Sequence, residues 1–305
     1  RGGEDPALEA AARRDIETFT LLAELDWDQV LAEVGGKAPR EYGPVLANLP
    51  RWRGSSPFSF AELTELYRAN GAGLFARHRA FLWEDGALCP VEQPDCPGAD
   101  EMLGYELQRN RVIANTRAML EGNLVNNVLL YGDSGTGKSA TVKNLLTLPG
   151  FEALRLIEVQ KEGLADLPRL IRTLGGRRLK FILFIDDLAF DQDDKTYSAL
   201  KTILEGGLER RPAKVAVYAT SNRRRLVRQT FSDRAGDEVD ASETIQEKTS
   251  LSDRFGLRIP YLALNQAEFL ELVEGMAEQA GIALDRDSLR AEAVKWEMRN
   301  PGRTP

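Results

Sequence analysis

The sequence has few of the residues that build metal and disulfide scaffolds. Its only cysteines are Cys89 and Cys96, and its only histidine is His78. Two cysteines do not make a disulfide framework, and a zinc site usually needs about four ligands. We therefore expect neither feature, and a reducing cytoplasmic location fits best.

Long apolar runs and an excess of basic residues are also missing. No run approaches the ~20 apolar residues of a membrane-spanning helix, and residues 1–15 lack the apolar segment of a signal peptide. The net charge of −7 argues against a chain built wholly to coat nucleic acid, although it leaves a local basic patch open. The 305 residues suffice for two or three domains.

The N-terminal third of the chain has helical patterns separated by loop-like sequence. Apolar residues recur at three- and four-residue steps over residues 6–34, and Gly35 and Gly36 end that pattern. Residues 39–57 favour a loop with a short helix, and a second helix is expected from about Ser59 to Trp83. These patterns predict an all-helical domain.

Proline-rich sequence at residues 89–100 is the best candidate for a linker. We accordingly place a helical N-terminal domain at residues 1–98. The rest of the chain then divides into an expected α/β core at residues 99–265, whose motifs indicate nucleotide binding, and a helical segment at residues 266–305, the lid.

The stretch GDSGTGKS, residues 132–139, is a complete G-x-x-x-x-G-K-[ST] pattern between an apolar run and a helix-like segment. Glycines allow backbone N–H groups to curl around phosphate oxygens. Lys138 can reach the β- and γ-phosphates, and the Ser139 hydroxyl can bind Mg²⁺. The expected nucleotide-binding residues here are Gly132, Asp133, Ser134, Gly135, Thr136, Gly137, Lys138, Ser139 and Ala140.

Strand and helix patterns alternate after this loop. The apolar runs that predict strands cover residues 154–159, 180–188, 214–222 and 257–264. Helical patterns at residues 102–123, 164–174 and 195–209 lie before and between them, and two more follow Gln266. This alternation predicts a three-layer α/β fold with a parallel sheet and a helical C-terminal lid.

Polar residues end two of the predicted strands. Asp186 and Asp187 follow the apolar run FILFI, where they can hold Mg²⁺ and orient the attacking water, or form a solvated turn. Thr220, Ser221 and Asn222 end the next strand at the same edge of the sheet. The Asn222 amide can reach the γ-phosphate or the water, although asparagine at a strand end is more often a turn residue.

In these features the chain resembles the AAA+ ATPases. The segments NNVLLYGDSGTGKS, FILFIDDL, YATSNRRRL and EKTSLSDRFGL are similar to a bacterial AAA+ family described only as a domain of unknown function, over about residues 100–303. The resemblance implies that Lys138 and Ser139 are the Walker A residues and Asp186 is the Walker B metal ligand. It also implies that Asn222 is sensor 1.

Further roles follow from the same resemblance. Arg254 matches the arginine finger that reaches a neighbouring subunit's γ-phosphate, and the alternative is a structural ion pair with Asp253 or another carboxylate. Arg303 matches the sensor 2 arginine of the lid. Leu103, Gly104 and Tyr105 match the segment that lines the adenine pocket.

Two departures from the family pattern affect the expected activity. Most AAA+ ATPases have Asp-Glu where this chain has Asp186-Asp187. Because the second side chain is one methylene shorter, either the backbone lies closer to the attacking water or hydrolysis is slow. The loop at residues 160–166 lacks the aromatic residue of protein-threading unfoldases. A cluster of basic residues would instead place positive charge near the centre of a ring or at an interface. Its partner is nucleic acid, another subunit or protein, or solvent alone. The cluster comprises Lys161, Arg223, Arg224, Arg225 and Arg228. The charged stretch 231–248 is expected to be an exposed loop.

We therefore expect an ATPase of AAA+ type that uses ATP, ADP and Mg²⁺ and forms a homo-oligomeric ring, for example a hexamer. Its catalytic residues would be Lys138, Asp187, Asn222 and Arg254. The work would be remodelling or switching of a protein client, without a membrane. A nucleic-acid-associated ATPase resembling helicase loaders, and a nucleotide sensor with little turnover, are the alternatives.

Overall fold

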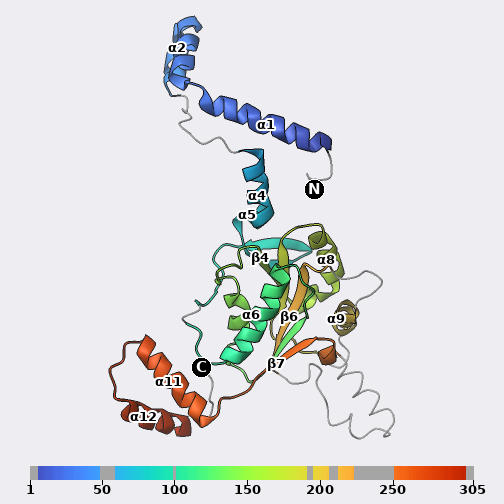
Figure 1. Ribbon diagram of the computed structural model, residues 1–305, viewed down its shortest axis with the longest axis vertical. Helices are drawn as coiled ribbons and strands as arrows, with labels where there is room; N and C mark the ends of the chain where they lie inside the picture. Colours follow the sequence, from blue (N-terminus) through green and yellow to red (C-terminus); the bar gives the residue numbers. More distant parts are fainter. Residues whose placement is uncertain are drawn as a thin grey trace. The chain divides into compact units, whose positions relative to one another are not determined.

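The computed structural model describes residues 6–48, 59–98, 101–190, 195–205, 212–222 and 251–299. The chain divides into two compact units, Arg1–Ala69 and Asn70–Pro305 (Figure 1). Within the described ranges, no helix combines the length and apolar character that crossing a membrane requires.

The first unit consists of helices, namely α1 (Pro6–Glu24), α2 (Trp27–Lys37), the 3-10 helix η1 (Arg40–Tyr42), α3 (Gly43–Ala47) and α4 (Phe60–Asn70). The single helix expected over residues 6–34 is wrong at two points. It is interrupted at Asp26, whose carboxylate caps α2. It also continues through Gly35 and Gly36, because a glycine weakens a helix by about 1 kcal/mol without ending it.

The second unit begins with a short helix and a hairpin, namely α5 (Leu74–Arg77), β1 (Ala80–Glu84) and β2 (Ala87–Val91). The expected helix from Ser59 to Trp83 is therefore wrong in its last part. Asp85 and Gly86 turn the hairpin at φ angles of 48° and 73°, the left-handed values that favour a tight two-residue turn. The sheet thus begins before residue 99, where we expected the core to start.

The remaining elements follow the predicted alternation. They are α6 (Glu106–Leu120), β3 (Val128–Gly132), α7 (Lys138–Asn144), β4 (Leu154–Val159), η2 (Lys161–Asp166), α8 (Leu167–Gly175), β5 (Lys180–Ile185), α9 (Lys195–Glu205), β6 (Val215–Ser221), β7 (Leu257–Tyr261), α11 (Gln266–Gln279) and α12 (Arg286–Arg299). The strands expected after the glycine-rich loop are confirmed. The helix expected over residues 102–123 begins later, at Glu106.

Seven strands form one sheet in the order β2-β1-β4-β5-β6-β3-β7. The β1–β2 pair is antiparallel, and every other neighbouring pair is parallel. Because parallel neighbours end at the same edge, the residues that follow β3, β5 and β6 meet there. The predicted α/β class with N-terminal helices and a C-terminal helix pair is confirmed.

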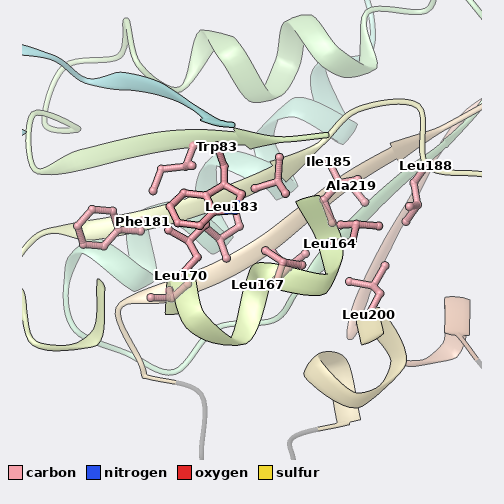
Figure 2. Packing of buried hydrophobic residues seen from close by; sticks show 14 of the residues in the cluster. Trp83, Leu164, Leu167, Leu170, Phe181, Leu183, Ile185, Leu188, Leu200 and Ala219 are labelled. Atoms are coloured by element: carbon pink, nitrogen blue, oxygen red, sulfur yellow. The ribbon is translucent and has the colours of Figure 1, made fainter. Parts of the chain in front are cut away.

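Each face of the sheet carries its own apolar core. Along β5, Phe181 and Leu183 face the cluster that contains Leu170 of α8, whereas Ile182 and Phe184 face the cluster that contains α6 and α7 residues. Figure 2 shows the α8 side, where leucines of η2, α8 and α9 pack on the strands. A strand buried on both faces is continuously apolar, so polar residues can begin only where β5 ends.

The opposite end of the sheet is fixed by a buried arginine. Arg155, on β4, is 2% exposed. Its guanidinium donates to the backbone carbonyls of Asn70 (2.6 Å), Phe75 (2.8 Å), Glu152 (2.6 Å) and Leu154 (2.8 Å). The side chain therefore ties the segment before the hairpin to the amino end of β4.

Candidate nucleotide-binding site

The glycine-rich loop connects β3 to α7 and starts against β7. Gly132 has a φ angle of 140°, and a Cβ atom there would lie 2.0 Å from the carbonyl oxygen of Tyr261. No larger residue fits this approach without moving the backbone. Gly135 and Gly137 have φ angles of 75° and 79°, which glycine adopts without a steric penalty. The loop curl therefore depends on its glycines.

Lys138 is buried inside this curl, with 6% of its surface exposed. Its ammonium donates to the carbonyl oxygens of Gly132 (3.2 Å) and Asp133 (2.5 Å) and to the Thr136 hydroxyl (3.4 Å). Burial lowers the pKa of Lys138 from its usual value, and nearby aspartates oppose the shift. These acceptors carry no formal charge, so the cation suits a phosphate oxygen.

A chain of hydrogen bonds joins the loop to the ends of β5 and β6. The hydroxyls of Ser139 (2.6 Å) and Thr220 (2.5 Å) both donate to Oδ1 of Asp186. The backbone N–H of Asp187 donates to Oγ1 of Thr220 at 2.9 Å. The Asn222 amide donates to Oδ1 of Asp187 at 2.9 Å. The structure thus brings together Ser139, both aspartates and Asn222, as expected from their strand ends.

Asp187 occupies an unusual backbone conformation, with a φ angle of 49°. Aspartate adopts this left-handed region more readily than most residues, and such outliers gather at functional sites. The turn is held because Leu188 donates its N–H to the Thr220 carbonyl (2.7 Å) and accepts from the Ser221 hydroxyl (2.8 Å). The carboxylate of Asp187 remains exposed at the edge of the sheet.

The donor set suits Mg²⁺. Ser139 and Asp186 offer oxygen atoms only, which is the preference of this cation. Among the residues that the structure describes, no group of three or more His, Cys, Asp and Glu side chains could hold a metal. Mg²⁺ usually binds through one or two carboxylates together with phosphates and water, so a sparse protein set fits this ion.

The segment expected to line the adenine pocket lies against the start of the lid. A Cβ atom on Gly104 would lie 3.4 Å from Leu272 of α11, and one on Gly275 would lie 3.5 Å from Leu103. Tyr105 precedes α6 at a φ angle of 53° and stacks on Tyr261, with ring centroids 5.0 Å apart. Their contact with adenine stays a prediction.

Arg254 lies away from the loop of its own chain. Residue 256 is close to Asn126, which precedes β3, since a Cβ atom on Gly256 would lie 2.3 Å from Oδ1 of Asn126. Arg254 therefore lies at the amino end of β7, and the glycine-rich loop lies at the carboxyl end. The carboxylate of Asp253 accepts from Arg258 at 2.5 Å.

Several expected residues fall outside the described part of the chain. These are Arg303, the arginines at 223, 224, 225 and 228, and the charged stretch 231–248. Lys161 is described, and its ammonium lies 5.7 Å from the centroid of the Phe190 ring.

Two residues make contacts that the sequence did not predict. Thr220 was placed at the right edge, but its bridge between Asp186 and Asp187 depends on the adjacency of β5 and β6. Asp133 was expected only as part of the phosphate loop, yet its side chain contacts the junction between β7 and α11 through Ala263. The position of Thr220 two residues before Asn222 pointed to a place at the site. No feature of the sequence indicated the contact of the Asp133 carboxylate with Ala263.

Fold and site together define the class of protein. A glycine-rich loop follows β3, which lies between β6 and β7, and an aspartate pair ends β5. A helix pair follows the last strand. This is the arrangement of an AAA+ P-loop core.

The chain belongs to the family described as "Protein of unknown function (DUF815)", whose model matches residues 76–305. A comparison with curated proteins finds no match. Among solved structures, the chain is similar to a mutant of the RuvB of Thermotoga maritima, with a TM-score of 0.40 and 16% identity over 66% of this chain and 59% of that chain.

Another similar structure is described as the RuvB Holliday junction branch migration motor of Thermotoga maritima. It has a TM-score of 0.38 and 18% identity, over 66% of this chain and 58% of that one. The chain thus spans about three fifths of the length of the solved structures it matches.

Proposed function

We propose that this protein is a Mg²⁺-dependent ATPase that couples ATP binding and hydrolysis to switching or remodelling of a protein partner. The observation that carries the proposal is the hydrogen-bonded chain from Ser139 through Asp186 and Thr220 to Asp187 and Asn222. These residues lie beside the buried Lys138. Together they supply a cation for the phosphates, oxygen ligands for Mg²⁺ and a carboxylate to position water, which are groups that in-line phosphoryl transfer uses.

Lys138, Ser139 and Asp186 would hold the triphosphate and its metal. The Lys138 ammonium would exchange its carbonyl acceptors for β- and γ-phosphate oxygens. Ser139 and Asp186 would ligate Mg²⁺, directly or through water, which when bound neutralises charge on the phosphates. Thr220 keeps the Asp186 carboxylate turned toward Ser139.

Asp187 and Asn222 would act on the attacking water. The hydrogen bond that the Asn222 side-chain amide donates fixes one carboxylate oxygen of Asp187, which leaves the other oxygen to accept a proton from water. Fixing the base in this way reduces the orientational freedom that the reaction must otherwise remove.

Arg254 would complete the site of a neighbouring subunit. Strand β7 has five residues, which at about 3.3 Å each separate its two ends by roughly 13 Å. Arg254 lies beyond the amino end, so it is poorly placed to reach the phosphates bound by its own chain. This position supports a homo-oligomeric ring in which the guanidinium stabilises charge across the subunit boundary.

The helical N-terminal unit would recruit the partner. No residue of α1, α2 or α3 is buried. Large apolar side chains there are exposed, for example Phe19 (63%) and Leu21 (66%). Such surfaces often mark protein-interaction sites. Sites of this kind support a protein client rather than a small-molecule substrate.

A nucleotide sensor with little turnover is the second candidate. It is favoured by Asp187, which is one methylene shorter than the glutamate of most AAA+ ATPases and is hydrogen-bonded to Asn222. Both candidates require ATP binding, and the turnover number separates them.

The first test is ATP hydrolysis as a function of Mg²⁺ and protein concentration. We expect activity that needs Mg²⁺ and rises steeply as the protein associates. Ser139→Ala and Asp186→Asn should lose most of it, whereas the matched exposed changes Thr173→Ala and Asp166→Asn should not. Normal hydrolysis by both site variants would overturn the proposal. Binding of ATP without turnover would leave the sensor.

A mixing experiment tests the position of Arg254. Arg254→Ala should bind ATP and fail to hydrolyse it, and Lys138→Ala should lose tight ATP binding. If the arginine acts across subunits, a mixture of the two inactive variants recovers part of the activity, because some sites combine an intact loop with a neighbour's Arg254. Normal turnover by assembled Arg254→Ala would remove the arginine from the mechanism.

A further inference from the structure

The side chain of Asp133 joins the glycine-rich loop to the start of the lid. Its backbone N–H donates to the carbonyl of Tyr261 at 2.9 Å, which extends the β3–β7 pairing beyond Gly132. Its carboxylate then accepts from the backbone N–H of Ala263 at 2.6 Å. A loop residue therefore holds the first residues of the connection that leads from β7 to α11.

The side chains of Tyr105 and Tyr261 also hold this connection in place. The Tyr105 hydroxyl donates to the Leu262 carbonyl at 2.6 Å, and its ring stacks on Tyr261. The Tyr261 hydroxyl shares a hydrogen bond of 2.9 Å with Thr141 of α7. Residues 261–263 are thus anchored to the loop, to the helix that follows the loop and to the residue before α6.

Movement of this connection would reach the lid directly. Helix α11 begins three residues after Ala263, at Gln266. Asn265 and Glu268 form a reciprocal capping box that fixes the first turn of the helix. A displacement at Ala263 would therefore move the start of α11, because only two residues separate them and the first turn is fixed by its cap.

Asp133 is also coupled to the residue that would bind phosphate. Its backbone carbonyl accepts from the ammonium of Lys138 and, at 2.8 Å, from the hydroxyl of Thr136. Phosphate oxygens compete for the same ammonium, because a charged acceptor forms the stronger hydrogen bond. Withdrawal of Lys138 would change the bonding of the residue that holds Ala263.

We propose that Asp133 is a positioning residue that couples the occupancy of the glycine-rich loop to the position of α11. The inference rests on the proposed function, because it takes a nucleoside triphosphate as the occupant of the loop. When a triphosphate draws the Lys138 ammonium away, the carbonyl of Asp133 loses that hydrogen bond. The carboxylate then transmits the change to Ala263 and the lid.

The experiment measures the core–lid distance by pulsed spin-label spectroscopy with and without MgATP. Both native cysteines are replaced by serine, and labels are placed at Gly176→Cys, where a Cβ atom has open space, and at the exposed Glu278→Cys. Nucleotide affinity is measured on the same proteins by calorimetry. The test variants are Asp133→Ala and Asp133→Asn, and the matched control is Asp166→Ala.

We expect MgATP to shift the core–lid distance in the parent protein and in the Asp166→Ala control. At MgATP concentrations that saturate it by calorimetry, Asp133→Ala should lose most of the shift. Asp133→Asn keeps an acceptor for Ala263 and should retain part of it, and it also serves if the alanine variant does not fold. Rescue by this conservative change distinguishes coupling from simple loss of structure.

Three results would overturn the inference, and they point to different failures. If the parent protein does not bind MgATP, the proposed function fails and the inference fails with it. If the parent binds MgATP without a shift, the lid does not respond to the loop. If both Asp133 variants bind MgATP and show the full shift, the ATPase proposal stands and Asp133 is not the link.

Discussion

The two ends of the parallel sheet use polar side chains in different ways. At the carboxyl end, Ser139, Thr220 and Asn222 are bonded to the carboxylates of Asp186 and Asp187. At the amino end, the Arg155 guanidinium is bonded entirely to backbone carbonyls.

The difference shows which end can exchange its partners. Side-chain bonds at the exposed carboxyl end can be replaced by bonds to a ligand without breaking the backbone. Carbonyls at the amino end would be left unsatisfied inside the protein, which costs about 1–3 kcal/mol for each group. Changes at the carboxyl end should therefore alter activity, and changes at the amino end should alter stability.

The largest effect is expected at Asp187. Asp187→Asn keeps the size of the side chain but removes the proposed base, so we expect turnover to fall by about 10²–10⁴-fold. The midpoint of thermal unfolding should change little, because the side chain is exposed. Steady-state ATP hydrolysis and thermal unfolding of the same protein measure both quantities.

Asp187→Glu adds the methylene that distinguishes this chain from most AAA+ ATPases. It should retain or increase turnover if the carboxylate is the base. Equal, wild-type activity in the asparagine variant would show instead that Asp187 only fixes the turn.

The amino end should give the opposite result in Arg155→Met. Several buried carbonyls lose their donor, and we expect the free energy of unfolding to fall by about 3 kcal/mol or more. ATP affinity of the remaining folded protein should be unchanged. Arg178→Met, at an exposed arginine, is the control and should stay within about 0.5 kcal/mol in chemical denaturation. A neutral Arg155 variant would mean that these bonds are dispensable.

Burial and the nearby Arg79 lower the pKa of Arg155 to about 10. The group therefore remains charged at neutral pH. A stability loss in Arg155→Met should accordingly be the same at pH 6 and at pH 8.

A smaller effect is expected at Thr220, which would orient the proposed metal ligand Asp186 without being a ligand itself. Thr220→Val keeps the shape and removes the hydroxyl that bridges Asp186 and Asp187. Loss of an outer hydrogen bond of this kind typically weakens metal binding by about 10–100-fold. The Mg²⁺ concentration for half-maximal hydrolysis should rise accordingly, whereas Thr173→Val should leave it unchanged. An unchanged Mg²⁺ requirement would contradict this role.

The smallest effect concerns the helix pair of the lid. Hydrogen bonds from Arg286 and then Arg290 lower the pKa of Glu274 from 4.5 to about 2. Because the folded pKa is depressed, the stabilisation is present above pH 4.5 and is lost as the pH falls toward 2. Glu274→Gln should lower the thermal midpoint slightly at pH 7, and the difference should disappear in acid. A difference that persists at low pH would exclude this origin.

Much of the fold was predictable because the core strands are continuous apolar runs. The run FILFI gave β5 and the position of Asp186 and Asp187 at its end. The β1–β2 hairpin was missed, although Asp85-Gly86 between apolar residues is a hairpin signal. Its first strand follows directly on a helical pattern that begins near Ser59, so the two were not separated.

Less of the site could be predicted, because its contacts join distant segments. The motif spacing indicated Lys138 and Ser139, and the end of an apolar run indicated Asp186, whereas the hydrogen bond between Asn222 and Asp187 depends on the order of strands in the sheet. The contact of Asp133 with Ala263 depends on the close approach of Gly132 to Tyr261, which no local pattern encodes. Arg155 interrupts an apolar run, and two of its carbonyl partners, Asn70 and Phe75, come from a segment about 80 residues earlier in the chain.

The central claim is that this loop holds ATP, and calorimetric titration with MgATP tests it most directly. The account predicts that the wild-type protein binds MgATP and that Lys138→Ala binds it at least about 10–150-fold more weakly, which corresponds to loss of a charge-assisted bond of about 1.5–3 kcal/mol. Both proteins should unfold at similar temperatures without nucleotide. Equal affinity in the two proteins, or no binding by the wild type, would contradict the account.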